Sequence, residues 1–500
     1  MALASFLSYI FGFLRDVFLA HFFGASSQTD AFNTAFLIPD FIFNLFIAGA
    51  LSGVLMPSLV NAEKKSPQKA VDLFASFLSI MNLLVSLISL LCFFITPFLI
   101  NKIFASNDIE QKKLIIALTR ILLLSPIFFG LSNTFGSLLL AKKRFFSLAL
   151  APIFYNIGIL LGMIFFAKKF GIFATAWGAA LGVFLHFLLR WIDFRNLNFP
   201  LKFSLNYKNK DFLKVLILAF PKTIGMMSFQ GMLWGFNLIC YRFFKDGALS
   251  AFAYARNLQS FSVSLFGIAL ATAVFPFLAE FSSKKNYQKF TNRLEKSSRQ
   301  ILFLALPASV GIFLLAEDIV EVIFSHGNFS QSSAQLTTNI LRLMAISIPF
   351  ESLTHLFARA FLACRNTIIP MIGQIIFFTL SVGSAFYLSF KSDAAILGLS
   401  FSIAALLQCV FLIITFHQKI SSFPFKVFLV NLTPTILLTF LMTIFIKILF
   451  LVTADYYIFW RLFLIIFLSA IFFFTSAFIL KMPEISRVRS FIANKLFFKK

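Results

Sequence analysis

The chain has 500 residues, of which 60% are hydrophobic and only 12% are charged. A soluble globular domain is about 45–50% apolar and roughly 25% charged, so this composition excludes an ordinary soluble protein and indicates a membrane protein. The basic residues outnumber the acidic residues by 43 to 19, which gives a net charge of +24. In a soluble protein this excess would suggest nucleic-acid binding, but in a membrane protein it must first be compared with the loop topology.

Long apolar segments separated by charged clusters recur along the whole chain. Because about 20 residues cross the ~30 Å hydrocarbon core of a bilayer, these segments predict an all-α polytopic membrane protein. The first segment lacks a basic leading region and contains Arg15 and Asp16, so we expect a retained helix and not a cleaved signal. We expect fourteen transmembrane helices, at about residues 1–23, 30–60, 70–101, 114–140, 146–167, 171–191, 211–243, 249–281, 299–324, 333–363, 367–388, 394–417, 426–450 and 456–480.

The basic residues between the predicted helices are distributed unequally between the two sides of the membrane. If the amino terminus is cytoplasmic, the connections on that side hold 27 basic residues and the connections on the opposite side hold seven. Cytoplasmic loops are enriched in Lys and Arg, so this bias predicts that both termini are cytoplasmic, including a basic tail over residues 481–500. It also accounts for most of the net charge without a nucleic-acid partner.

Two stretches about 220 residues apart resemble each other. The octet 50–57 and the octet 269–276 both end in proline, and each is followed by Lys-Lys-x-x-Gln-Lys, at 64–69 and at 284–289. This internal repeat predicts two six-helix lobes in the same orientation, with a substrate path between them near the midplane, as in transporters with parallel repeats. The expected organisation is an N-terminal lobe over 1–195, a cytoplasmic linker over 196–210, a C-terminal lobe over 211–417 and two further helices over 426–480.

Signatures of catalysis are absent from the sequence. There is no Gly-x-x-x-x-Gly-Lys-Ser/Thr phosphate loop, no His-Glu-x-x-His and no Cys-x-x-Cys. We therefore expect a transporter and not an enzyme, with no catalytic residue, no metal site and no cofactor. Four cysteines lie in or at the edge of apolar segments and predict no disulfide framework, namely Cys92, Cys240, Cys364 and Cys409.

Ionisable residues inside the predicted helices are costly there, and they usually face a cavity or a partner. Snorkelling towards a helix end is the simplest interpretation of Asp16, Arg242 and Arg359. The residues of this kind are Arg15, Asp16, Asp30 and Asp40 in the first lobe, and Lys222, Arg242, Arg256, Arg342, Glu351, His355 and Arg359 in the second.

Four of these residues allow a closer interpretation. Arg15 forms an ion pair with Asp30 across a short turn or contacts a ligand, and the sequence leaves both open. Glu351 and His355 are one helical turn apart, which is typical of a structural pair. Arg256 has no acidic neighbour in the sequence and is the stronger candidate for binding an anion.

Several segments resemble the opening signature of the MurJ/MviN family, which comprises lipid II flippases of the multidrug/oligosaccharidyl-lipid/polysaccharide exporter superfamily. In this chain they are Gly-Phe-Leu-Arg-Asp at 12–16, Thr-Asp-Ala-Phe at 29–32 and Gly-Ala-Leu-Ser at 49–52 leading to Pro57. The resemblance covers essentially the whole chain, including Leu-Pro-Ala at 306–308. It implies two lobes around a cationic cavity, with helices 13 and 14 forming a groove for a polyprenyl tail.

The chain departs from the family pattern at several cavity positions. Tyr9 replaces a usual arginine, and Phe43 and Asn44 stand where arginines are often found. In the eighth helix the cation is moved by one position to Arg256, which is about 100° around a helix. The resemblance then implies that pyrophosphate binding relies on Arg15 and Arg256, with Lys222 or Arg242. The segment 367–388 has no acidic residue, so sodium coupling is not expected.

Together, these features predict a flippase that moves lipid II, the undecaprenyl-pyrophosphate-linked disaccharide-pentapeptide, from the cytoplasmic to the periplasmic leaflet by alternating access. We expect a monomer in the bacterial inner membrane, in contact with lipid II and the bilayer. An O-antigen-type polysaccharide flippase, a multidrug/cation antiporter, a membrane-bound glycosyl- or phosphotransferase and a non-transporting scaffold remain alternatives. The candidate substrate-binding residues are Arg15, Asp30, Asn44, Lys222, Arg242 and Arg256.

Overall fold

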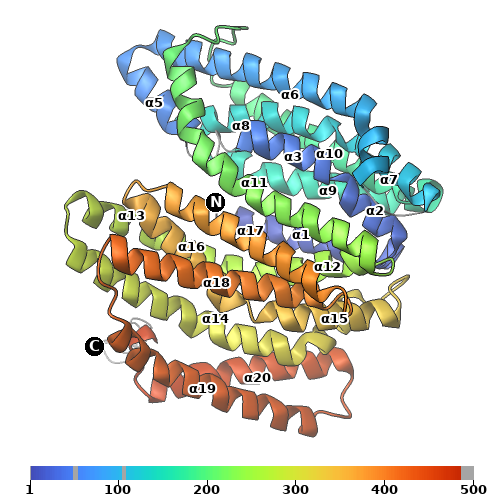
Figure 1. The fold of residues 1–500 in the computed structure, drawn as a ribbon, viewed down its shortest axis with the longest axis vertical. Helices are drawn as coiled ribbons and strands as arrows, with labels where there is room; N and C mark the ends of the chain where they lie inside the picture. Colours follow the sequence, from blue (N-terminus) through green and yellow to red (C-terminus); the bar gives the residue numbers. More distant parts are fainter. Residues whose placement is uncertain (1, 49–53, 104–107, 486–500) are drawn as a thin grey trace, which may run out of the picture. The chain divides into compact units, whose positions relative to one another are not determined.

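The computed structural model describes residues 2–48, 54–103 and 108–485, and every regular element in these ranges is a helix (Figure 1). The chain forms two compact units. The first unit contains residues 1–253 together with two short segments from later in the chain, 324–333 and 385–394, and the second unit contains the remainder. Gly49, residues 50–53 of the first octet and most of the basic tail lie outside the described residues.

The first unit is built from helices that pack as one bundle. In chain order they are α1 (Ala2–Phe23), α2 (Ser27–Ala35), α3 (Leu37–Phe43), the π-helix η1 (Asn44–Ala48), α5 (Leu55–Lys65), α6 (Pro67–Ile103), α7 (Ile109–Leu122), α8 (Leu124–Ala141), α9 (Phe146–Phe170), α10 (Phe173–Arg195) and α11 (Lys210–Phe243).

The second unit begins within the helix that follows, at residue 254. Its elements are α12 (Ala248–Ser262), the π-helix η2 (Val263–Ile268), α13 (Ala269–Ser283), α14 (Tyr287–Phe324), α15 (Gln331–Ala345), α16 (Ile348–Ala363), α17 (Ile368–Leu388), α18 (Ile396–Lys419), α19 (Phe425–Val452), α20 (Ile458–Ile479) and the short η3 (Pro483–Ile485).

The described part of the chain holds 12 helical spans that are long and apolar enough to cross a membrane. The bent pair α15 and α16, which meet at 48°, makes a thirteenth if the pair forms one span. Helix α1 has 22 residues, and at 1.5 Å per residue it rises about 33 Å, which is long enough for a further span. The chain is therefore a multi-pass membrane protein, and these spans are compatible with the fourteen expected.

The internal repeat is visible in the helix geometry. A π-helical segment, η1 or η2, lies before each of the two octets in the chain, and the two segments begin 219 residues apart. Pro57 and Pro276 are separated by the same 219 residues. Because π-helical turns are rare and frequently lie at functional sites, their recurrence at this offset is unlike chance. It supports the predicted repeat independently of the sequence match.

Helices α8 and α16 also end in the same way. Lys143 and Arg365 follow their last turns in the left-handed conformation, with φ of 59° and 57°. In both cases the next residue donates its backbone N–H to the carbonyl five positions earlier, at 2.9 Å. This is the Schellman arrangement that terminates many helices. The fourth span of each lobe is therefore stopped by the same backbone geometry.

Helices α9 and α10 are in backbone contact, as the glycine spacings Gly158/Gly162 and Gly178/Gly182 predict. A Cβ atom on Gly158 would collide with the backbone of Gly182, and a Cβ atom on Gly162 would lie 2.8 Å from the Cα of Gly178. The two helices lie side by side in Figure 1. These glycines therefore form a packing face between the two helices.

The last two helices of the second unit pack on α14. An apolar cluster joins Phe303 and Leu315 of α14 to residues along both α19 and α20. Arg461 of α20 binds both carboxylate oxygens of Asp318 of α14, at 3.0 and 2.6 Å. At the other end of the cluster, Arg299 of α14 binds Glu484 in η3 at 2.6 Å. Helix α20 is thus joined to α14 near both of its ends.

Candidate functional site

Arg15 lies on α1 and forms a salt bridge with its neighbour Asp16. The Arg15 Nη2 and Nε atoms lie 2.7 and 3.0 Å from Asp16 Oδ1. The exposed fraction of the Asp16 side chain is 7%, against 28% for Arg15. The interpretation of Asp16 as a snorkelling residue is therefore wrong, because its carboxylate is buried and paired. This bond takes up part of the charge that Arg15 would offer to a ligand.

Asp30 lies in the first turn of α2 and binds the beginning of α12. One carboxylate oxygen accepts the backbone N–H of Gly247 at 2.7 Å, and the other accepts the backbone N–H of Ser250 at 2.7 Å and its hydroxyl. The first N–H groups of a helix have no partner within the helix, and a carboxylate there also interacts favourably with the helix dipole. The predicted Arg15–Asp30 ion pair is thus replaced by the Arg15–Asp16 pair and this helix cap.

The cap requires a close approach of two turns. Gly247 has φ of 91°, and a Cβ atom there would collide with the carbonyl oxygen of Ala25. Thr34, one turn after Asp30, extends the contact because its hydroxyl lies 3.1 Å from the Tyr241 hydroxyl and accepts the Asn237 amide at 3.0 Å. Helix α2 is thereby fixed to the end of α11 and the start of α12.

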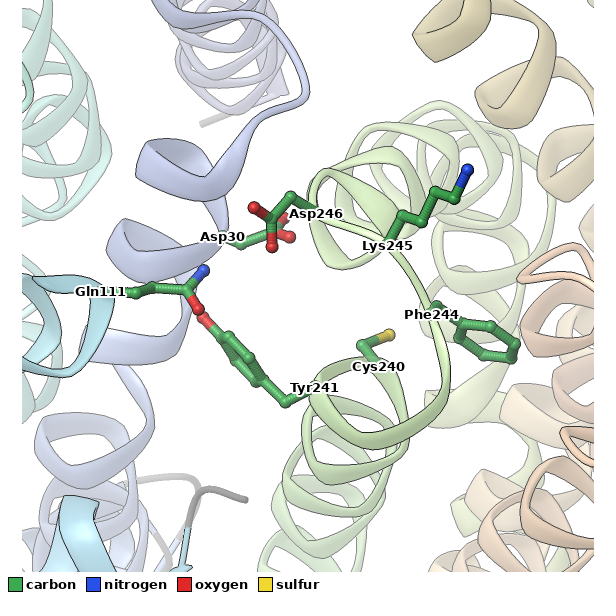
Figure 2. Close-up of a pocket in the computed structure, with 7 residues that line it drawn as sticks. All are labelled: Asp30, Gln111, Cys240, Tyr241, Phe244, Lys245 and Asp246. Carbon is green, nitrogen blue, oxygen red and sulfur yellow. The ribbon is translucent and has the colours of Figure 1, made fainter. Parts of the chain in front are cut away.

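A small pocket of about 50 Å³ opens beside Asp30 (Figure 2). In this view Asp30, Gln111 and Tyr241 extend towards it from α2, α7 and α11, and the Lys245 chain points away from them. A site needs about 10–15 Å³ on this measure to hold a water molecule, so the pocket has room for water. Its lining residues are Asp30, Gln111, Cys240, Tyr241, Phe244, Lys245 and Asp246.

Asn44 is the first residue of η1. Its side-chain amide donates to the carbonyl of Asp40 at 2.9 Å. The backbone N–H of Asn44 also bonds to this carbonyl, so the side chain adds a second hydrogen bond to the same acceptor. The structure thus gives Asn44 a local backbone contact, and a role in substrate binding stays a prediction.

Lys222 and Arg242 both lie on α11 with exposed side chains. Lys222 directly follows Pro221 within the helix. Arg242 lies in the last helical turn, with its guanidinium 5.4 Å from the ring centre of Phe243. This position at a helix end agrees with snorkelling. Neither residue lines the pocket of Figure 2.

Arg256 lies on α12, about two turns after its capped beginning. The fold brings the carboxylate of Glu351, on α16, within electrostatic reach of its guanidinium. Gln259, one turn after Arg256, donates its amide to Glu351 Oε2 at 2.7 Å and to Ser347 Oγ at 2.8 Å. Arg256 has no acidic neighbour along the sequence, but the structure supplies one from another helix.

The neighbours of Glu351 differ from those expected. The hydrogen bond that the structure gives Glu351 comes from Gln259 and not from His355, so the predicted pair on α16 is not seen. Arg359, one turn after His355, donates to the carbonyl of Ile268 at 3.3 Å. Ile268 is the last residue of η2, so Arg359 satisfies a carbonyl of the π-helical segment instead of snorkelling.

Five of the six candidate residues lie in the first compact unit, and Arg256 lies in the second. The sequence reasoning missed Ser250 and Gln259, which position Asp30 and Glu351. The Asp-Gly pair at 246–247 is a turn signal, so a helix cap near Ser250 could have been considered. Gln259 is one turn from Arg256 on the same face of α12, which is a weaker signal. In the described part of the chain, no group of three His, Cys, Asp or Glu residues is placed to hold a metal ion.

Comparisons with known proteins identify the family. The sequence profile of the family described as lipid II flippase MurJ matches residues 19–468. A protein from Buchnera aphidicola subspecies Schizaphis graminum, named probable lipid II flippase MurJ, is 27% identical over 427 residues, which cover 83% of this chain and 81% of that protein.

Solved structures agree with this result. The structure titled lipid II flippase MurJ, inward closed conformation, has a TM-score of 0.81 and 25% sequence identity, with 96% of this chain and 98% of that chain covered. A multidrug resistance MATE family transporter of the MOP superfamily, in an inward-facing conformation, has a TM-score of 0.71 at 13% identity, covering 82% and 94%, and so shares the fold alone. The profile match over nearly the whole length shows that this chain belongs to the lipid II flippase MurJ family.

Proposed function

We propose that this protein transports lipid II from the cytoplasmic to the periplasmic leaflet of the bacterial inner membrane. The observation that carries the proposal is the family profile, whose match spans residues 19–468, nine-tenths of the chain. Alternating access of the two predicted lobes, 1–195 and 211–417, is the mechanism that the internal repeat supports. The protein would then act on its substrate without any covalent chemistry.

The physical task of such a protein is to lower the cost of moving a charged headgroup through hydrocarbon. A pyrophosphate needs cations and water along its path, and the planar guanidinium of arginine binds two phosphate oxygens at once. Both arginines lie near a carboxylate, but Arg15 donates two hydrogen bonds to Asp16, whereas the Glu351 carboxylate near Arg256 also accepts the amide of Gln259. We therefore assign the main phosphate contact to Arg256, with Arg15, Lys222, Arg242 and Asn44 as further candidates.

Asp30 has a different role in this proposal. Its carboxylate binds Gly247 and Ser250 and is 4% exposed, so it orients α12 and does not meet an anionic headgroup. Like charge would also repel a pyrophosphate. Asp30 is thus a positioning residue for Arg256.

The membrane arrangement is part of the proposal. The excess of basic residues on one side supports cytoplasmic termini, a cytoplasmic linker over 196–210 and a cytoplasmic tail over 481–500. The protein is proposed to work as a monomer that contacts lipid II and the bilayer. The helices of 426–480 stand outside the repeat and pack on α14.

A second candidate function is export of another ligand by a protein of the same fold. The fold shared with the MATE family transporter favours this candidate over an enzyme. A cation antiporter needs acidic groups at its binding site, whereas Asp16 and Asp30 are each engaged in bonds with the protein. A polysaccharide flippase differs in its sugar headgroup and shares the phosphate chemistry.

Complementation separates these functions. The chain is expressed in a bacterium whose own lipid II flippase is depleted, and growth and peptidoglycan synthesis are measured. Restored growth with the wild-type chain, and none with an Arg256→Ala variant of equal abundance, is the expected result. Normal membrane abundance without any rescue, together with restored O-antigen export or drug efflux in strains that lack those transporters, would assign the second function.

A further inference from the structure

The connection between α10 and α11 exposes an apolar strip outside the membrane spans. The flanking spans end at Arg195 and begin at Lys210. Between them Leu201, Phe203 and Leu205 are 50%, 75% and 49% exposed, and Tyr207 is 64% exposed. Exposed apolar side chains within a membrane span are surrounded by lipid. In a connection outside the spans the same side chains would lie in water, which is unfavourable. We define these four residues as the linker strip.

The linker strip lies in a segment without regular secondary structure that ends in a turn, where the N–H of Tyr207 bonds to the Leu205 carbonyl at 2.8 Å. Ser204, in the middle of the segment, donates its N–H to the hydroxyl of Ser79 at 3.1 Å and places its own hydroxyl 3.4 Å from Ser76. Both Ser76 and Ser79 belong to α6. The segment is therefore fixed to α6 at Ser204, while the four residues of the linker strip stay exposed.

The position of Ser79 places the linker strip at the edge of the lipid-facing surface. Residues 70–82 of α6 are almost all buried, whereas Leu83 is 43% exposed and Leu87 57% exposed. Leu83 is one turn, about 6 Å, from Ser79. On α11 the lipid-facing surface likewise begins with Leu213, which is 44% exposed, just after the linker. The linker strip thus lies where the apolar surface of the helices meets the headgroup region.

Basic residues accompany the strip. Lys202, Lys208, Lys210 and Lys214 are exposed in the same stretch, and Lys208 lies 5.8 Å from the ring centre of Tyr207. Asp211 is the acidic residue of this region, and it is paired with Lys65 at 3.5 Å. Apolar and aromatic side chains next to lysines match the boundary between acyl chains and anionic headgroups.

We propose that residues 201–208 form an interfacial anchor that binds anionic phospholipid at the bilayer surface. The linker strip inserts at the level where headgroups meet acyl chains, and the lysines bind lipid phosphates while their stems follow the apolar surface. The partner is the membrane itself and not a soluble protein. This anchor joins the connection between the two predicted lobes to one leaflet.

Site-directed spin labelling of the full-length protein tests the proposal. The four native cysteines are first replaced by alanine, and single cysteines then replace Phe203 or Leu205. The control is Asn206→Cys, an exposed polar position in the same segment, and Leu213→Cys serves as a lipid-exposed reference. Each labelled protein is reconstituted in vesicles of phosphatidylglycerol and phosphatidylcholine in equal parts, and collision with oxygen and with a water-soluble nickel chelate is measured.

Labels at 203 and 205 are expected to collide mainly with oxygen, as at 213, whereas the label at 206 collides mainly with the nickel chelate. Vesicles of phosphatidylcholine alone, or Lys202→Gln with Lys208→Gln, are expected to shift the label at 203 towards the aqueous result. Equal access of the nickel chelate to positions 203 and 206 in the anionic vesicles would overturn the anchor. Immersion that is unchanged by both the lipid and the lysine substitutions would overturn binding of anionic headgroups.

Discussion

The carboxylate of Asp30 accepts both the backbone N–H and the hydroxyl of Ser250, although 220 residues separate them in the chain. This contact caps α12, and Arg256 lies further along the same helix. The main segment of the first compact unit ends at residue 253, three residues before Arg256. The Asp30 side chain of α2 therefore fixes the start of α12. The bond therefore links the position of Arg256, the proposed phosphate contact, to Asp30, a carboxylate that does not itself bind phosphate.

Substitution of Asp30 tests this relationship. Asp30→Ala removes the acceptor for three hydrogen bonds, and loss of a helix cap costs about 0.5–2 kcal/mol. We expect Asp30→Ala to lose complementation of a lipid II flippase depletion while membrane abundance, measured by immunoblot, falls only modestly. Ser250→Ala keeps the backbone N–H and is expected to retain most activity. Full activity of Asp30→Ala would contradict a positioning role.

Removal of Arg15 is expected to reduce both transport and abundance. Arg15→Ala leaves the Asp16 carboxylate, which is 7% exposed, without its arginine. Removal of one member of a buried ion pair costs up to about 3–5 kcal/mol, and the partial exposure of Arg15 places this case at the low end. The double variant Arg15→Ala/Asp16→Asn should recover abundance but not complementation. Recovery of both would make the pair purely structural.

Arg256 is expected to be required for transport and not for folding. Arg256→Ala should abolish complementation at normal abundance, and Arg256→Lys should retain a fraction because lysine cannot bind two phosphate oxygens as a planar fork. Glu351→Gln is the informative companion. If Glu351 only restrains the Arg256 side chain, Glu351→Gln keeps transport activity. Uptake of fluorescent lipid II into vesicles that contain the variant measures this activity. Full complementation by Arg256→Ala would remove Arg256 from the site.

Cysteine labelling tests the orientation in the membrane. Ser282 donates to the sulfur of Cys364 at 3.5 Å, so Cys364 and the exposed Ser283 lie at the same end of the second unit. We expect an impermeant maleimide to label Cys364 and Ser283→Cys in inverted membrane vesicles and not in intact cells. Labelling of Ser283→Cys from outside intact cells would reverse the proposed topology.

The rate at which the maleimide labels Cys364 should depend on pH. Burial raises the pKa of the Cys364 thiol above its usual range, more than the Ser282 hydrogen bond lowers it. Maleimides react with the thiolate, so a higher pKa leaves less reactive thiolate at neutral pH. Labelling of Cys364 should therefore be slower than labelling of Ser283→Cys near pH 7 and should gain most as pH rises. Equal rates for the two positions across this range would contradict the effect of burial.

The glycine contact between α9 and α10 predicts a stability difference. Gly158→Ala forces a methyl group against the backbone of Gly182, and overpacking of this kind costs about 1–3 kcal/mol. Gly311→Ala on α14 is the matched control, because no described atom lies within 4 Å of its Cβ position. We expect a lower Tm in detergent for Gly158→Ala and an unchanged or higher Tm for Gly311→Ala. An equal Tm for both variants would be inconsistent with close packing.

Much of this fold follows from local features of the sequence. Apolar length predicts the spans, and the recurrence of Lys-Lys-x-x-Gln-Lys predicts a repeat that the two π-helical segments support. The second span, expected over 30–60, is interrupted, and Pro39, Gly49 and Pro57 are the sequence signals of such interruptions. In the described residues it consists of α2, α3, η1 and α5, and the π-helical form of η1 leaves no mark on hydrophobic periodicity.

The candidate residues were recognised by type, but their partners were not. A charge inside a span is visible in the sequence, so Arg15, Asp30 and Arg256 stand out. Their partners lie one residue away for Arg15, 220 residues away for Asp30 and 95 residues away for Arg256. The last two depend on which helices meet in three dimensions, and one sequence contains no direct signal of that pairing.

The backbone contact between α9 and α10 has a mechanical consequence. Where main chains touch along two glycine pairs, no side chain remains that can change rotamer and let one helix slide on the other. We therefore expect these helices, of 25 and 23 residues, to move together as one rigid unit. Between their counterparts α17 and α18 the glycine contact is with side chains, because a Cβ atom on Gly373 of α17 would meet Leu412 and Gln408 of α18. We therefore expect α17 and α18 to shift against each other more easily than α9 and α10.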